Sequence, residues 1–143
     1  MVSRTRRRWE RGNTMVLGAL MLTLALGLFA LIMDGGLLYA SKSRLQTYAQ
    51  EVARAGATAV DLNGVTGSGT AHLNVTLAQQ QATQYFQALN LGPTYVMTIT
   101  ALTPNSITVQ LSHEQPVYLI GAFVPINSVS IVVEASAVPK AGF

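Results

Sequence analysis

The sequence predicts an α+β protein: a long N-terminal transmembrane helix continues into an amphipathic helix, and a further helix packs on a small three-stranded antiparallel sheet. Two observations predict this class. Residues 13–33 contain no charged residue, and the hydrophobic period changes from helical to alternating in the last fifty residues. The predicted divisions are a basic cytoplasmic tail (1–12), a transmembrane helix (13–33), an extracytoplasmic helix continuing it (34–62), a linker (63–70) and a small α+β extracytoplasmic domain (71–143).

Residues 13–33 have the length and composition of a membrane anchor. At about 1.5 Å per residue they make a helix of roughly 30 Å, the thickness of a bilayer's hydrocarbon core. Five of the nine Lys and Arg residues lie in the first eleven positions. Because such residues stay on the cytoplasmic side, we expect the N-terminus inside and the rest outside. The alternative is a cleaved signal peptide, but this apolar run is longer and lacks a small-x-small exit.

The overall composition excludes several classes of function. Half of the residues are hydrophobic and only 10% are charged, well below the quarter or so that is typical of soluble domains. The net charge of +3 comes from the basic tip, so the remaining body is nearly neutral and makes a poor phosphate-binding surface. Because the body is nearly neutral, we expect no nucleic-acid partner. There is no cysteine, which excludes disulfides and thiolate metal sites.

Asp34 directly follows the apolar run. An Asp at the centre of a transmembrane helix costs about 2.5–3.5 kcal/mol for insertion, but at the boundary it can reach water and cost less. The favoured interpretation is that Asp34 marks the outer interface. The alternative is that it pairs with a partner's basic residue or main chain just inside that interface.

Residues 37–60 are expected to continue the helix out of the membrane. Good helix formers dominate, and the helix is expected to end near residues 61–64, with Gly64 as a C-cap. The Gly/Ser/Thr-rich stretch 63–70 is typical of a flexible linker. One face of the helix is apolar at steps of three, four and seven; it contains Leu38, Leu45, Tyr48, Ala49, Val52, Gly56 and Ala59.

The second half of the sequence is predicted to form one helix and three strands. Thr76 and Gln79 fit a capping box at the helix start, and Gly92-Pro93 should stop the helix. Residues 95–102 and 107–111 alternate around the turn sequence 103–106, which predicts a hairpin; residues 129–135 predict a third strand. Residues 116–125 are apolar throughout but too short to span a membrane. They are either buried against the hairpin or exposed as a docking or membrane-contacting patch.

No catalytic constellation is visible. Catalysis needs convergent titratable groups, and the outer part offers only His72 in a loop and His113 at a strand end, with scattered carboxylates. Two histidines so far apart, without a third ligand, are typical of exposed loop residues rather than a metal site. The sequence therefore predicts no catalytic residues, no metal, no cofactor and no enzyme activity.

A family resemblance covers roughly residues 6–60. Arg11-Gly12, the apolar run, Met33-Asp34, then Arg44-Leu45-Gln46 and an alanine-rich stretch follow one another in order. This arrangement resembles the N-terminal segment of the TadE/TadG-like proteins of the bacterial tight-adherence (Flp pilus) system. The resemblance implies a pseudopilin-like fold and a structural or accessory role in assembling or anchoring a Tad (Flp) type IV pilus, a system of adhesion and secretion.

Two differences from the family pattern indicate which branch of the TadE/TadG-like proteins this chain resembles more. TadE proteins and major Flp pilins have a Gly processed by prepilin peptidase, with Glu at the fifth position after it. Gly12 is present but residue 17 is Leu, so the bond between Gly12 and Asn13 is only a candidate cleavage position. Large TadG proteins carry a von Willebrand-like domain, for which this chain has no room. A short TadG-like protein is the leading interpretation, with TadE second.

The resemblance implies a single-pass protein of the bacterial inner membrane with a cytoplasmic N-terminus and an extracytoplasmic C-terminal domain. Its expected partners are the membrane and other Tad/Flp assembly proteins or pilin-like subunits, with no small-molecule substrate. The alternative is a membrane-tethered extracytoplasmic module that binds a ligand or peptide. The candidate assembly contacts are Asp34, Leu38, Leu45, Tyr48, Val52 and the 117–124 segment.

Overall fold

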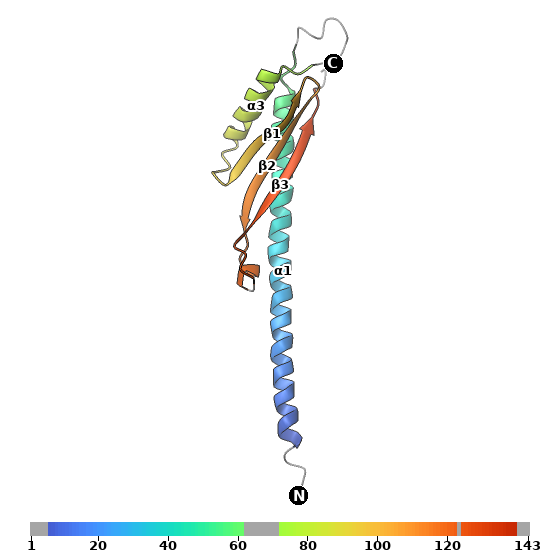
Figure 1. Cartoon of the computed structure of the whole chain (residues 1–143), viewed down its shortest axis with the longest axis vertical. Helices are drawn as coiled ribbons and strands as arrows, with labels where there is room; N and C mark the ends of the chain where they lie inside the picture. The colour runs from blue at the N-terminus through green and yellow to red at the C-terminus, as the bar shows by residue number, and fades with distance from the viewer. Residues whose placement is uncertain (1–5, 62–71, 123, 140–143) are drawn as a thin grey trace. The chain divides into compact units, whose positions relative to one another are not determined.

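The computed structural model describes residues 6–61, 72–122 and 124–139 and confirms the predicted α+β class (Figure 1). The chain forms two compact units. The first, here the anchor unit, contains Met1–Leu37 and Val117–Asn127; the second, the sheet unit, contains Leu38–Pro116 and Ser128–Phe143. The elements in chain order are α1 (Arg6–Ala57), α3 (Val75–Ala88), β1 (Tyr95–Thr103), β2 (Ser106–Pro116), η1 (Ile120–Ala122) and β3 (Ser128–Ala137).

Helix α1 ends at Ala57, so the expected end near residues 61–64 is wrong by about one turn. Its last turn tightens through a bond from the Thr58 N–H to the Ala55 carbonyl, a common way to satisfy terminal carbonyls. After the helix, Val60 forms an isolated antiparallel β-bridge with Leu73. Gly64 and the predicted 63–70 linker lie outside the described residues.

Helix α3 (Val75–Ala88) begins two residues earlier than the capping box predicted. Asn74, not Thr76, is the N-cap: its backbone is extended and its side-chain oxygen accepts the Leu77 N–H at 3.2 Å. Asn and Thr are both good N-caps, so the local sequence offered two starts. The helix ends at Ala88, before the expected Gly92-Pro93 stop, and the chain turns through Asn90 and Gly92, whose φ angles are 46° and 91°.

The three predicted strands form one antiparallel sheet in the order β1-β2-β3. The predicted turn joins β1 to β2, where the Thr103 hydroxyl accepts the Ser106 N–H at 3.0 Å. Strand β1 is irregular between Ile99 and Ala101. Strands β2 and β3 pair in continuous register, and the 117–127 segment connects them.

The core of the sheet unit joins α1, α3 and one face of the sheet. Alternate residues of the middle and last strands point into it, and both helices contribute mainly small residues. A Cβ on Gly56 would lie 2.6 Å from the Ile107 Cδ1, so helix and sheet approach closely there. The most buried members are Leu45, Ala49, Val52, Ala53, Ala78, Ala82, Ile107, Val109 and Leu111.

Candidate functional site

The anchor unit contains a buried carboxylate with two backbone partners. Asp34 is 2% exposed, and its Oδ2 accepts the N–H of Leu119 at 2.9 Å and the N–H of Ile120 at 2.7 Å. Among the described residues it is the one charged side chain that is buried. We call this arrangement, formed by the Asp34 carboxylate and the N–H groups of Leu119 and Ile120, the Asp34 clasp.

The loop conformation explains why these two N–H groups are available. The first N–H groups of a helical turn have no partner inside that turn, and Leu119 and Ile120 begin the turn of η1. The turn itself closes through the Ala122 N–H to the Leu119 carbonyl. Gly121 lies at a tight place, because a Cβ there would be 3.0 Å from the Ile126 carbonyl oxygen.

Asp34 is buried, so it does not reach water as was expected of an Asp at the outer interface; its place at that interface stays a prediction. A buried charge is costly unless it is hydrogen-bonded, and two charge-assisted bonds from N–H donors offset that cost. The alternative expectation was a basic residue or the main chain of a partner protein. The donors are on this chain's own 117–127 segment rather than on another protein.

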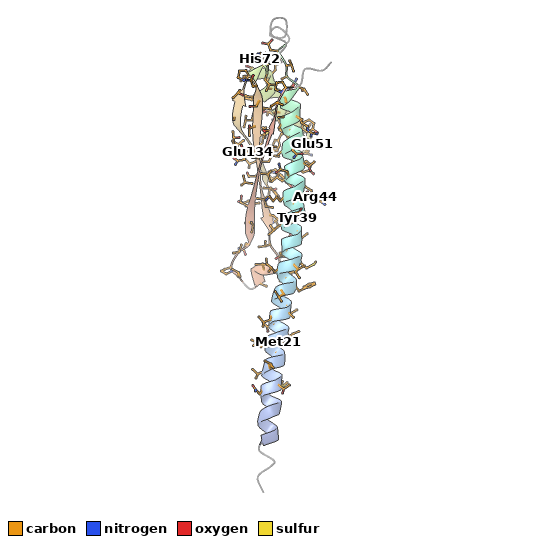
Figure 2. The ribbon with its side chains drawn as sticks, turned by 90° about the vertical axis from the view of Figure 1, so that its right-hand side faces the viewer. Met21, Tyr39, Arg44, Glu51, His72 and Glu134 are labelled. Atoms are coloured by element: carbon orange, nitrogen blue, oxygen red, sulfur yellow. The ribbon has the colours of Figure 1, made fainter. Side chains whose placement is uncertain are left out.

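Large apolar side chains are exposed around the clasp. On α1 they include Met33, 48% exposed, and Leu37, 47% exposed; Figure 2 shows Met21 projecting from the same helix nearer its start. In the segment 117–126, here the apolar loop, Val117 is buried. Among the described residues of the loop, the exposed large apolar side chains are those of Tyr118, Leu119, Val124 and Ile126. Of the two expectations for this segment, the structure supports the exposed patch.

The sheet unit places four of the candidate assembly contacts differently. Leu45 and Val52 are fully buried in this chain's own core, and Leu38 and Tyr48 pack against it. The apolar face of the helix was predicted correctly, but its occupant is the chain's own sheet and second helix. Leu45 and Val52 are therefore unavailable as contacts with another protein, which corrects that part of the prediction.

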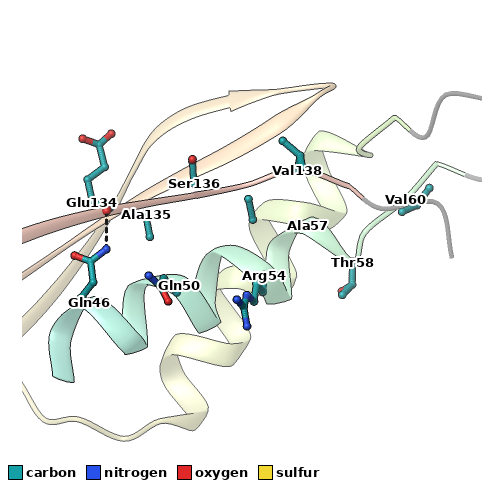
Figure 3. Close-up of a pocket in the computed structure, with 11 residues that line it drawn as sticks. Gln46, Gln50, Arg54, Ala57, Thr58, Val60, Glu134, Ala135, Ser136 and Val138 are labelled. Carbon is teal, nitrogen blue, oxygen red and sulfur yellow. Dashed lines mark hydrogen bonds between the residues drawn. The ribbon is translucent and has the colours of Figure 1, made fainter. Parts of the chain in front are cut away.

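A groove runs between the end of α1 and strand β3 (Figure 3). At one end, Gln46 Nε2 donates to the Glu134 carbonyl at 3.1 Å. Gln50, Arg54 and Ser136 also line it. Because Glu134 sits on the last strand of the sheet, this bond occupies one of the edge groups that would otherwise face solvent.

The two histidines lie at opposite ends of the β1–β2 hairpin. His72 Nδ1 is 3.1 Å from Asn105 Oδ1 beside the turn, whereas the His113 ring stacks on Tyr95 with centroids 4.0 Å apart. No group of three potential metal-ligating side chains occurs in the described part of the chain. The structure therefore does not bring the sequence-predicted histidines together.

Sequence reasoning found Asp34 but missed its partners. Backbone N–H groups carry no side-chain signature, so Leu119 and Ile120 could not be singled out. The available signal was indirect: the segment between Pro116 and Pro125 carries no charged residue.

These features define an α+β protein with one candidate membrane helix: among the described residues, Asn13–Ala57 is long and apolar enough to cross a bilayer. Residues 12–59 match the family Tad, described as Putative Flp pilus-assembly TadE/G-like, which confirms the resemblance predicted from the sequence. Comparison with curated proteins and with solved structures found no match. Together, the family match and the apolar helix indicate a membrane protein related to Flp pilus assembly.

Proposed function

We propose that this chain is a single-pass protein of the bacterial inner membrane, a structural or accessory component in assembling or anchoring a Tad (Flp) pilus. The observation that carries the proposal is that the family match, residues 12–59, lies almost entirely on one helix, α1 (Arg6–Ala57). That helix supplies both the exposed apolar anchor and part of the sheet unit's core. The family description also names pilus assembly.

The proposed orientation has the N-terminus in the cytoplasm and the sheet unit outside. It rests on the five arginines among the first eleven residues and on the positive-inside rule. Because the chain has no cysteine, Ser3→Cys and Gln80→Cys can each carry a single label. A membrane-impermeant thiol reagent added to spheroplasts should modify the Gln80→Cys protein and leave the Ser3→Cys protein unmodified until lysis. The opposite pattern would reverse the orientation.

The proposed partners are lipid and the helices of other Tad or pilin-like subunits. The described side chains of the anchor are largely exposed, and a Cβ added to Gly18 or Gly27 would meet nothing within 4 Å. Small residues let transmembrane helices approach each other closely. Enlarging Gly27 therefore leaves this chain's own fold intact while obstructing a neighbouring helix.

A deletion strain tests the function directly. Loss of the chain should lower the yield of surface filaments, and the wild-type copy should restore it. A Gly27→Leu copy should restore it less well than a Leu28→Ile copy, which keeps the size of an exposed apolar side chain. Wild-type filament yield in the deletion strain would overturn the proposal.

The groove beside β3 favours one second candidate, an extracytoplasmic peptide-binding module. Extended peptides can add to an exposed sheet edge, and β3 is such an edge strand. An added peptide would have to displace the bond from Gln46 to the Glu134 carbonyl. The test must use the whole chain, because a fragment 64–143 would lack the α1 residues of the core. Peptide binding that Gln46→Ala alters, together with normal filaments in the deletion strain, would favour this candidate.

A further inference from the structure

We propose that the apolar loop, residues 117–126, lies in the outer headgroup region of the same bilayer that α1 crosses, so that the partner of this surface is lipid. The inference rests on the proposed membrane span of α1. It goes beyond that proposal because it assigns a second membrane contact, distant in sequence, to the connection between β2 and β3.

The Asp34 clasp fixes the position of the loop along α1. Asp34 follows the charge-free run 13–33 directly, and that run has the length of the hydrocarbon core. The Leu119 and Ile120 N–H groups lie within 3 Å of its carboxylate. The loop is therefore held at the level where the apolar helix leaves the hydrocarbon.

The composition of the loop suits that level. No charged residue occurs between Glu114 and Glu134, yet Tyr118 is 68% exposed and Ile126 is 43% exposed. A loop in water normally carries polar side chains at such positions. Tyrosine is enriched where the bilayer meets water, because its ring is apolar and its hydroxyl is polar.

Most of the described backbone N–H groups of the loop have partners within the protein. Non-helical backbone at membrane depth must have its N–H and C=O groups satisfied within the protein. The Leu119 and Ile120 N–H groups bond to Asp34. Four further N–H groups bond to carbonyls within the segment 117–127: those of Val117, Ala122, Val124 and Ile126.

Continuity with the anchor identifies lipid rather than a protein as the occupant. Met33 and Leu37 expose apolar side chains on either side of Asp34, and the charge between them is covered. Apart from the Tyr118 hydroxyl, the exposed side chains described on the loop and around Asp34 are apolar, and the one charge is buried. Together they offer the apolar surface that acyl chains and the headgroup boundary accept.

Fluorescence quenching in proteoliposomes tests the proposal on the full chain. Single cysteines are introduced in the cysteine-free background and labelled with a polarity-sensitive dye: Tyr118→Cys in the loop, Leu24→Cys in the anchor, and Val96→Cys on β1. Val96 is 55% exposed, so it is a matched exposed apolar site outside the loop. Circular dichroism checks that each labelled protein keeps its fold.

The dye at position 118 should be quenched by brominated lipids, more strongly by bromines near the headgroups than by bromines near the bilayer centre. The dye at position 24 should show the reverse preference, and the dye at position 96 should respond only to aqueous iodide. Quenching at 118 by iodide to the extent seen at 96 would overturn the proposal. A blue-shifted emission at 118 without any bromine response would also overturn it, because a protein would then cover the loop.

The dye at position 24 separates the two proposals. If position 24 responds to brominated lipid and position 118 does not, α1 spans the membrane and only the loop inference fails. If position 24 also fails to respond, the membrane span itself fails, and the proposed function fails with it.

Discussion

The Asp34 carboxylate accepts the backbone N–H of Ile120 at 2.7 Å across 86 positions of the chain. A side chain at the end of the apolar run thus determines where the connection between β2 and β3 lies. The bond is charge-assisted, which makes it roughly twice as strong as a neutral hydrogen bond. Asp34 is therefore a structural residue of the anchor unit.

Replacing Asp34 by Ala should release the apolar loop. Leaving a buried donor unsatisfied costs about 1–3 kcal/mol, and Asp34→Ala removes the acceptor of two donors. Hydrogen exchange of a peptide covering residues 117–122 should accelerate in bilayer nanodiscs. Asp34→Asn keeps a neutral acceptor oxygen and should give an intermediate rate.

Glu114→Gln is the matched control, because Glu114 is an exposed carboxylate on β2. It should leave exchange in the loop unchanged. Equal exchange rates in the wild-type and Asp34→Ala proteins would show that the clasp does not hold the loop.

The sequence predicted the elements better than it predicted their partners. The hairpin around residues 103–106 and the third strand follow from local alternation and turn chemistry, so the fold class could be read directly. The elements that pack on the Leu45–Val52 face could not be predicted, because periodicity shows that a helix face is apolar but not which part of the chain covers it. The α3 cap was misplaced since Asn74 and Thr76 are both capping residues, and the choice depends on the backbone of Asn74.

Adding a methyl group at Gly56 should destabilise the sheet unit. The new Cβ would lie 2.6 Å from the Ile107 side chain, 3.2 Å from the Ala78 carbonyl oxygen and 3.3 Å from the Ala82 Cβ. Overpacking of a core typically costs about 1–3 kcal/mol, more than the roughly 1 kcal/mol that replacing Gly gains in helix propensity. Chemical denaturation of the whole chain in detergent should show a lower midpoint for Gly56→Ala.

Gly35→Ala is the control on the same helix, since its Cβ would meet nothing within 4 Å. It should be neutral or slightly stabilising because of helix propensity alone. A Gly56→Ala protein as stable as Gly35→Ala would contradict the close packing of α1 on the sheet.

The Tyr85 hydroxyl should lose its proton at a higher pH than an ordinary tyrosine. The negative charge of Glu51 raises the pKa of Tyr85 above its ordinary value of 10.0, with smaller contributions from desolvation and from the hydroxyl's bond to that carboxylate. A raised pKa favours neutral tyrosine in the folded state. This small contribution to stability is therefore complete below pH 10 and is lost as pH rises through the folded-state pKa.

Tyrosinate absorbance measures that titration. Tyr85→Phe should remove a late phase from the curve, and Glu51→Gln should move this phase to lower pH, whereas Glu114→Gln should not. A curve for Glu51→Gln that matches the wild type would contradict the assigned cause.

The protein purified from its native membrane should retain its arginine-rich tail. Residue 17 is Leu, whereas the processed branch of the resembled family has Glu at the position five after the Gly. Intact mass spectrometry distinguishes the full-length chain from a product that begins at Asn13. The shortened product would contradict the expectation and would favour a subunit that enters the filament.

The alanine-rich end of α1 has a consequence for sequence variation in this segment. Ala49 and Ala53 are buried in the core that α1 shares with α3 and the sheet, and Gly56 lies close to both α3 and the sheet. The volume of a side chain therefore limits substitution in this segment more than its polarity does. A serine adds one small atom and can return its hydroxyl to the helix backbone, whereas a leucine, although fully apolar, has no room. We therefore expect serine to be tolerated better than leucine along this stretch, which is the reverse of a ranking by hydropathy.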